Sequence, residues 1–161
     1  MHMLRSPTSD ADLVGPNLWV GSRPLPGRYR WLHALVLTAI EYQPPGWAFP
    51  GITIVRAPLD DDPSRPMTRE EVDAAISGGR TVARFLTAHQ RVLVTCAMGL
   101  NRSALVAALA MQDAFDMSAD EAIYRIREAR GPVALSNPNF TGLIDRMHNR
   151  RKASDAKRRR R

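Results

Sequence analysis

The residues with the clearest chemical potential lie in a short stretch, Cys-Ala-Met-Gly-Leu-Asn-Arg-Ser, at positions 96–103. Cys96 is the only cysteine in the sequence, and Arg102 follows it six positions later. A cysteine thiolate is a strong nucleophile, and the planar guanidinium of arginine can hold two oxygens of a phosphoryl group at once. These two residue types, joined by a short loop, therefore predict attack by sulfur on a bound oxyanion such as a phosphate ester.

The segments on either side predict how these residues are positioned. Residues 92–94 form a short apolar run typical of a buried strand, and residues 104–111 form a longer run typical of a buried helix. Backbone N–H groups at the start of a helix are unpaired and partly positive, so residues 96–102, the Cys96 loop, are expected to bind an anion and to favour a thiolate. Gly99 permits a close backbone approach, and Ser103 could cap the helix or donate its hydroxyl to the sulfur as it leaves.

With the strand before it, the helix after it, Gly99 in the middle and Ser103 after the arginine, this stretch resembles the Cys-x5-Arg-Ser/Thr signature of the cysteine-dependent protein tyrosine phosphatase superfamily. The glycine is placed as in the dual-specificity phosphatase group. The resemblance implies a phosphomonoester hydrolase that forms a cysteinyl-phosphate intermediate at Cys96 and needs no metal or other cofactor. A free cysteine buried at a strand end is the structural alternative, but it leaves the spacing of Gly, Arg and Ser unexplained. The phosphate-binding residues implied are Ala97, Met98, Gly99, Leu100, Asn101 and Arg102.

A cluster of acidic residues follows the predicted strand at 52–56, in the sequence Ala-Pro-Leu-Asp-Asp-Asp-Pro. Cleavage of a phosphoester by a thiolate leaves an alkoxide, which a nearby carboxylic acid must protonate. The resemblance places this general acid on the loop after this strand, a few residues beyond a proline. Asp61 fits that spacing best, Asp60 second and Asp62 third. The alternative is an exposed acidic turn with no catalytic role.

One position departs from the family pattern. The residue before the nucleophile is usually a histidine that helps to hold the loop and the thiolate, whereas this chain has Thr95. A threonine hydroxyl could donate a weaker substitute bond. The departure therefore puts the activation of Cys96 in question.

The rest of the sequence predicts an α/β fold with a central, mostly parallel sheet of four or five strands and helices on both faces. Strands are expected at residues 17–21, 34–40, 52–56 and 92–94, and the continuous apolar run at 34–40 indicates a sheet covered on both faces. Thr68 and Ser118 open capping boxes, and Pro138 marks the start of the last helix. Gly78 and Gly79 within the first of these helices predict a tightly packed neighbour or a local break.

The resemblance covers roughly residues 17–147 and divides the chain into three parts. These are a flexible lead-in at 1–14, a dual-specificity-phosphatase-like catalytic domain at 15–149 and a basic, disordered tail at 150–161. The tail holds eight Lys/Arg and one acidic residue, so it carries the whole net charge of +7 and leaves the remainder neutral. Such a run is expected either to be a solubilising end or to bind RNA, DNA or another acidic surface.

These observations predict a dual-specificity protein phosphatase acting on phosphotyrosine and on phosphoserine or phosphothreonine in phosphorylated proteins. An RNA 5′-triphosphatase of the same superfamily is the first alternative, because Gly-Leu-Asn-Arg at 99–102 is similar to its loop and the basic tail suits RNA. The second alternative is a pseudophosphatase that binds phosphorylated partners without turnover. The neutral side chains of the Cys96 loop argue against a multiply charged lipid headgroup.

The remaining expectations concern the cellular compartment and the exposure of individual arginines. One cysteine excludes an internal disulfide, and no apolar run approaches the roughly 20 residues that span a bilayer, so a cytoplasmic protein without membrane contact is expected. Arg23 could face the phosphate site but is expected at the surface. Arg125, Arg127 and Arg130 are expected to be solvated.

Overall fold

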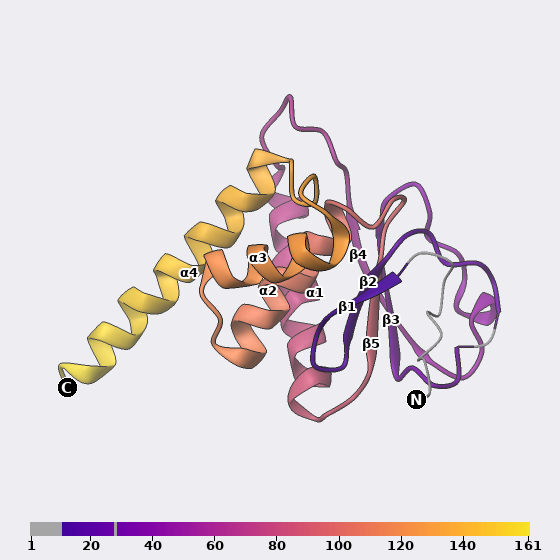
Figure 1. Cartoon of the computed structure of the whole chain (residues 1–161), viewed down its shortest axis with the longest axis horizontal. Helices are drawn as coiled ribbons and strands as arrows, with labels where there is room; N and C mark the ends of the chain where they lie inside the picture. The colour runs from indigo at the N-terminus through magenta and orange to yellow at the C-terminus, as the bar shows by residue number, and fades with distance from the viewer. Residues whose placement is uncertain (1–10, 28) are drawn as a thin grey trace.

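A five-stranded sheet and four α-helices form the framework of residues 11–27 and 29–161, which are the residues that the computed structural model of the protein describes. The strands lie in the order β1-β2-β5-β3-β4, and only the β1–β2 pair is antiparallel (Figure 1). The predicted α/β fold with a mostly parallel sheet is therefore confirmed. The elements are β1 (Ala11–Gly15), β2 (Leu18–Gly21), β3 (Ala34–Ala39), η1 (Gly46–Ala48), β4 (Thr53–Leu59), α1 (Arg69–Thr87), β5 (Val92–Thr95), α2 (Arg102–Phe115), α3 (Ala119–Arg130) and α4 (Pro138–Arg159).

Alternate side chains of the central strands enter two separate cores. Val92 and Val94 pack with residues of all four helices, whereas Leu93 packs on the opposite face. That second face is covered by loop residues such as Tyr29 and Phe49, together with the short η1, and no α-helix contributes to it among the described residues. The prediction of helices on both faces is wrong. The apolar strands correctly indicated two buried faces, but their pattern does not distinguish a covering helix from a covering loop.

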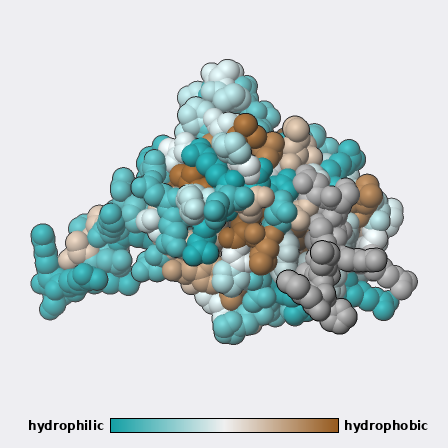
Figure 2. Space-filling model, in the orientation of Figure 1, coloured by the Kyte–Doolittle hydropathy of each residue, from teal (hydrophilic) through white to brown (hydrophobic). Residues whose placement is uncertain are grey.

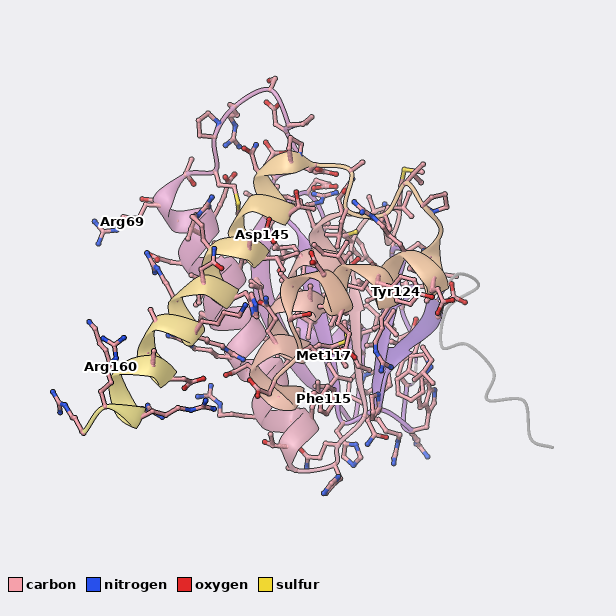
Figure 3. All side chains as sticks on the ribbon, turned by 60° about the vertical axis from the view of Figure 1, so that its left-hand side comes forward. Arg69, Phe115, Met117, Tyr124, Asp145 and Arg160 are labelled. Atoms are coloured by element: carbon pink, nitrogen blue, oxygen red, sulfur yellow. The ribbon has the colours of Figure 1, made fainter. Side chains whose placement is uncertain are left out.

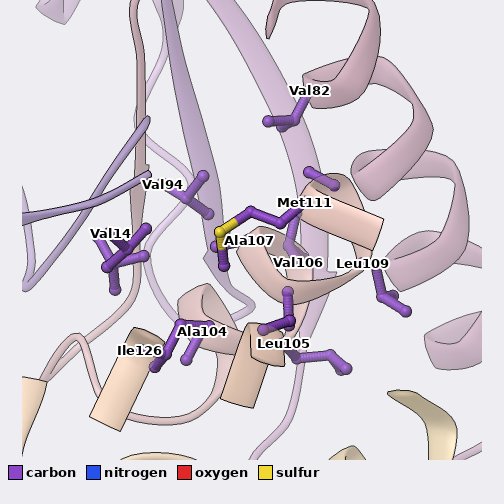
Figure 4. Packing of buried hydrophobic residues seen from close by; sticks show 14 of the residues in the cluster. Val14, Val82, Val94, Ala104, Leu105, Val106, Ala107, Leu109, Met111 and Ile126 are labelled. Atoms are coloured by element: carbon purple, nitrogen blue, oxygen red, sulfur yellow. The ribbon is translucent and has the colours of Figure 1, made fainter. Parts of the chain in front are cut away.

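Helix α2 occupies the centre of the helical layer, where residues 102–112 are all buried (Figure 4). Helix α1 packs closely against α2 and β4 through its two glycines. A Cβ atom added at Gly78 would lie 2.8 Å from the Cβ of Ala57, and one added at Gly79 would lie 2.8 Å from the Cβ of Leu109. The predicted tightly packed neighbour is thus present at both glycines, as β4 beside Gly78 and α2 beside Gly79. Since α2 is enclosed, the loop that precedes it is held against the carboxyl edge of the sheet.

Two segments that the sequence predicted to be flexible or disordered, residues 11–14 and 150–159, have regular structure. Residues 11–14, assigned to the flexible lead-in, lie in β1, which forms a hairpin with β2 through a turn where Asn17 has a φ of 60°. The remainder of that lead-in, residues 1–10, lies outside the described residues. Residues 150–159, expected to be disordered, continue helix α4. Arginine, lysine and alanine are good helix formers, and an existing helix extends without a new nucleation cost.

Candidate active site

The Cys96 loop connects β5 to α2, and its carbonyl groups bond to residues outside the loop. In a trans peptide the C=O and the next N–H point in opposite directions, so outward carbonyls turn the loop amides inward. Helix α2 adds further free amides, because its N-cap residue Asn101 makes no side-chain capping bond. The result fits the predicted anion-binding loop. The donors to the four carbonyls are Arg23 N to Ala97 at 3.4 Å, Arg130 Nη2 to Met98 at 3.1 Å, Arg130 Nε to Gly99 at 2.9 Å and Leu135 N to Leu100 at 2.9 Å.

Gly99 is required by the shape of the loop. Its φ is 67°, in the left-handed region, and its N–H donates to the Sγ of Cys96 at 3.2 Å. A Cβ atom at this position would lie 2.6 Å from the carbonyl carbon of Gly21 and 2.5 Å from Nη2 of Arg130. No side chain fits without moving the backbone of β2 or the loop.

The sulfur of Cys96 is buried and has one partner on its own loop and another in the first turn of α2. The residue is 3% exposed, and the Oγ of the fully buried Ser103 lies 3.1 Å from Sγ. With the Gly99 amide, this hydroxyl can stabilise negative charge on the sulfur. The structure thus brings Ser103 beside Cys96, as the sequence predicted.

Arg102 is also buried, and it pairs with a residue that the sequence analysis missed. Its Nη1 and Nη2 donate to the two carboxylate oxygens of Glu41 at 2.5 and 2.7 Å, and Nη1 also donates to the carbonyl of Leu59 at 3.1 Å. Its Nε is buried and has no hydrogen-bond partner among the described residues. Glu41 follows β3 at the carboxyl edge of the sheet, where ligands of α/β folds bind, and that placement was the signal that could have identified it.

The pKa values of Arg102 and Glu41 depend on each other. Burial by itself lowers the pKa of Arg102, but the hydrogen bonds to Glu41 and the negative charges of Cys96, Glu41 and Asp61 raise it above its ordinary value. The hydrogen bond from Arg102 in turn lowers the pKa of Glu41. The guanidinium therefore stays charged within reach of the thiolate and of the acidic loop.

The three aspartates after β4 have different partners. Asp60 pairs with Arg65 at 3.1 Å. Asp62 accepts hydrogen bonds from the hydroxyl and the backbone N–H of Ser64, and these bonds lower its pKa. Asp61 instead accepts a hydrogen bond at Oδ1 from Nδ2 of Asn137, at 2.9 Å. Asp61, the first choice from the sequence, is therefore the one of the three that is linked to the segment before α4.

Asn137 joins the acidic loop to the Cys96 loop, and the sequence analysis assigned it no role beyond the start of the last helix. It is 3% exposed, and its N–H donates to Oδ1 of Asn101 at 3.2 Å. Its own Oδ1 accepts from the N–H of Asn139, as an N-cap does. Because Oδ1 is used for the cap, Nδ2 is oriented towards Asp61.

The expectation that Arg130 is solvated is wrong. Its side chain is 4% exposed, and besides the two loop carbonyls it bonds to Asp12 of β1 at 2.8 Å. Arg130 is the last residue of helix α3, before Gly131 with its φ of 101°, and from this end of the helix its guanidinium reaches the Cys96 loop. Nothing in the helical spacing of α3 marks this position, since the contact depends on tertiary structure.

Thr95 and Arg23 complete the surroundings of the sulfur. The Thr95 hydroxyl donates to the carbonyl of Val36 at 2.9 Å, so this hydrogen bond links β5 to β3 and is not directed to the Cys96 loop. Arg23 is exposed, as predicted, and its guanidinium lies 3.8 Å from the centre of the Tyr42 ring. Arg23, Tyr42 and Cys96 share a cavity of about 50 Å³.

Metal-binding and membrane-spanning features were sought in the described part of the chain. No group of three or more His, Cys, Asp or Glu residues is gathered there as metal ligands would be. None of the helices described has the length and apolar character needed to cross a membrane.

A family model and a sequence relative agree on one family, and solved structures share the fold. A model of the dual specificity phosphatase catalytic domain matches residues 41–150, which include Glu41, Asp61, the Cys96 loop and Asn137. Human dual specificity phosphatase 28 is 28% identical in an alignment of 142 residues that covers 83% of this chain and 74% of that protein. Its crystal structure superposes with a TM-score of 0.71 at 22% identity, covering 92% of this chain and 97% of that one. The structure of PTPMT1 gives a TM-score of 0.70 at 19% identity, covering 91% and 99%.

Proposed function

Because the chain belongs to the dual specificity phosphatase family, we propose that it hydrolyses phosphomonoesters of phosphorylated proteins, phosphotyrosine above all, through a cysteinyl-phosphate intermediate. One observation carries this proposal: the buried Nε of Arg102 has no partner among the described residues, beside a buried sulfur that accepts a hydrogen bond from the Gly99 amide and lies 3.1 Å from the Ser103 hydroxyl. A buried polar group without a partner is costly, and a phosphoryl oxygen would satisfy it.

In the first step the thiolate of Cys96 attacks phosphorus. The S–P bond forms as the P–O bond to the leaving group breaks, while the loop amides and Arg102 stabilise the three remaining oxygens. Asp61 transfers its proton to the leaving oxygen. The hydrogen bond from Asn137 to Oδ1 supports this role, because it leaves Oδ2 as the oxygen that carries the proton.

In the second step water attacks phosphorus and the S–P bond breaks. Asp61, now ionised, accepts the proton of the attacking water. Ser103 donates its hydroxyl to the departing sulfur, which is 3.1 Å from Oγ. The products are inorganic phosphate and the free thiolate, so the cycle needs only water and the phosphoester.

The surroundings of Cys96 favour an aryl phosphate. The residue is 3% exposed, so a phosphotyrosine, with its ring between phosphate and peptide, reaches it more easily than phosphoserine or phosphothreonine does. Tyr42 and Pro24 line the adjoining cavity and can contact the ring. The loop side chains Ala97 and Met98 carry no charge, which disfavours a multiply charged lipid headgroup. The lone cysteine suits action in the reducing cytoplasm.

Two alternatives remain distinguishable. The loop sequence Gly-Leu-Asn-Arg at 99–102 keeps an RNA 5′-triphosphatase as an alternative, and those enzymes work without an aspartate acid. A pseudophosphatase would bind phosphopeptides without turnover. The hydrogen bond between Asn137 and Asp61 favours the phosphatase that uses the acid.

The test is hydrolysis of a generic aryl phosphate, a phosphotyrosine peptide and a 5′-triphosphate RNA. Cys96→Ser should abolish turnover of the first two. Asp61→Asn should lower kcat on the phosphopeptide by about 100-fold, while the matched variant Asp62→Asn should stay close to wild type. Full phosphopeptide activity in Asp61→Asn would overturn the assignment of the acid, and RNA cleavage alone would establish the first alternative. Binding of phosphopeptide without any turnover would establish the second.

A further inference from the structure

The far end of α4 concentrates the charge of the protein. Residues 150–161, the basic end, contain eight Lys/Arg and a single acid, Asp155, whereas the other residues are neutral overall. Figures 1 and 3 show this part of α4 extending away from the body of the domain, with Arg160 close to its tip. Residues 152–161 are all exposed.

Basic side chains surround the helix. Six of the eight recur at a spacing of seven residues, which is close to two helical turns, and form three rows around the axis. Within the described residues only Arg151 of this group forms an ion pair, with Asp113 at 2.7 Å, and it also donates to the carbonyl of Gln112. The other seven cations have no carboxylate partner there. The three rows are Arg150 with Lys157, Arg151 with Arg158, and Lys152 with Arg159.

The composition of the basic end determines which partner fits it. Its apolar residues are Ala153 and Ala156, so it lacks the apolar face with which a helix enters a membrane surface. It also lacks the aromatic residues that dominate most protein interfaces. Figure 2 shows the projecting end as almost uniformly hydrophilic on the visible side. A partner must therefore supply closely repeated negative charge.

We propose that the basic end of α4 is a nucleic-acid-binding surface that contacts the phosphodiester backbone without reading the sequence. Six of its eight cations are arginines, whose planar donors suit phosphate. This binding goes beyond the proposed hydrolysis and uses a separate surface. The 22 residues of α4 span about 33 Å, and Asn137, which bonds to both Asp61 and Asn101, stands at the opposite end. A bound nucleic acid would hold the enzyme near phosphoproteins on the same polymer and leave the Cys96 loop open.

The test measures binding of the full chain to a labelled single-stranded RNA of roughly 20 nucleotides and to duplex DNA, by fluorescence anisotropy between about 50 and 200 mM salt. If five to seven phosphates are contacted, log K against log salt should have a slope of about −3.5 to −5 for the single strand. The triple variant Lys157→Gln/Arg158→Gln/Arg159→Gln should lose at least about tenfold in affinity and give a shallower slope.

A matched control removes three exposed arginines elsewhere, in Arg69→Gln/Arg84→Gln/Arg125→Gln, and should retain affinity. Hydrolysis of an aryl phosphate should stay within about twofold of wild type in both triples, and saturating RNA should not inhibit it competitively. Equal loss of affinity in both triples, unchanged binding in the first, or binding to anionic vesicles in place of nucleic acid would overturn the proposal. Failure of the proposed function would look different, because turnover would be absent while binding persisted.

Discussion

Arg102 donates through both Nη groups to the two carboxylate oxygens of Glu41, at 2.5 and 2.7 Å, and keeps Nε for another acceptor. An arginine has two edges that can bind an oxyanion in a bidentate manner. Glu41 binds the edge of the guanidinium formed by the two Nη groups and does not occupy the edge that contains Nε. The carboxylate therefore orients the arginine without occupying the edge that we assign to phosphate.

Replacing Glu41 tests this orienting role. Glu41→Gln keeps the shape but loses the ion pair, and we expect kcat/KM for an aryl phosphate to fall by about tenfold, equivalent to about 1.4 kcal/mol. Arg102→Lys, which cannot make both contacts at once, should lose more. A gain in kcat/KM for Glu41→Gln would show instead that Glu41 competes with phosphate for Arg102. Steady-state kinetics on purified variants decide between these outcomes.

Asn137→Ser should impair proton transfer to the leaving group. Serine can still cap α4, but it removes the amide that donates to Asp61. We expect about a tenfold loss of kcat on phenyl phosphate, whose leaving group needs a proton, and a smaller loss on p-nitrophenyl phosphate, whose leaving group does not. Equal losses on both substrates would indicate a purely structural role. Thermal unfolding of the variant serves as the control for folding.

Gly99→Ala should be far more damaging than the same change at another glycine with positive φ. Gly51 has a φ of 87° but nothing within 4 Å of an added Cβ atom, whereas at Gly99 the backbone of Gly21 lies at 2.6 Å. We expect Gly51→Ala to cost about 1 kcal/mol of unfolding free energy and to keep full activity. Gly99→Ala should cost more and lower kcat/KM by at least about 100-fold, because the loop amides are displaced. Near-normal kinetics for Gly99→Ala would refute the need for this loop shape.

The stability contributed by Glu71 should depend on pH. Its hydrogen bonds with Arg65, at 2.7 and 3.1 Å, lower its pKa from the ordinary 4.5. A carboxylate with a lowered folded pKa stabilises the fold fully above its unfolded pKa, and this contribution is lost as the pH falls through the folded value. Glu71→Gln, which can still form the capping box with Thr68, should be less stable by up to about 1 kcal/mol at pH 7.

The measurement is urea unfolding of wild type and Glu71→Gln in steps from neutral to acidic pH. The difference in unfolding free energy should shrink below pH 4.5 and approach zero in acid. A difference that stays constant over this range would mean that the charge of Glu71 does not contribute.

The parts of the site that could be predicted are those that local sequence controls. A short apolar strand, a glycine-containing turn and a buried helix follow one another directly, so the Cys96 loop and its relation to Ser103 could be placed before any tertiary contact was known. Asp61 was selected over Asp60 and Asp62 from its spacing after a proline, which the family resemblance supplied. The Thr68 and Ser118 sequence patterns likewise gave the starts of α1 and α3, where Thr68 forms a full capping box and Ser118 an N-cap bond.

The residues that were missed depend on contacts between distant segments. Glu41 bonds to Arg102 from the loop after β3, Asn137 bonds to Asp61 from the N-cap of α4, and Arg130 reaches the Cys96 loop from the end of α3. No spacing rule within one element reveals such contacts. The sequence underestimated the length of α4 for another reason. Repulsion among the cations of residues 150–161 predicts disorder for an isolated segment, but here that segment extends a helix that residues 138–147 already form.

The loops that cover the second face of the sheet restrict which mutations the residues beside Cys96 can accept. Tyr29 and Phe49 of these loops belong to a buried core, while Arg23 and Tyr42 of the same loops border Cys96. A mutation that adapts this border to a new substrate must therefore also preserve the smaller core beneath the second face. Substrate preference in such a domain should evolve slowly, through replacements that conserve core volume in two loops.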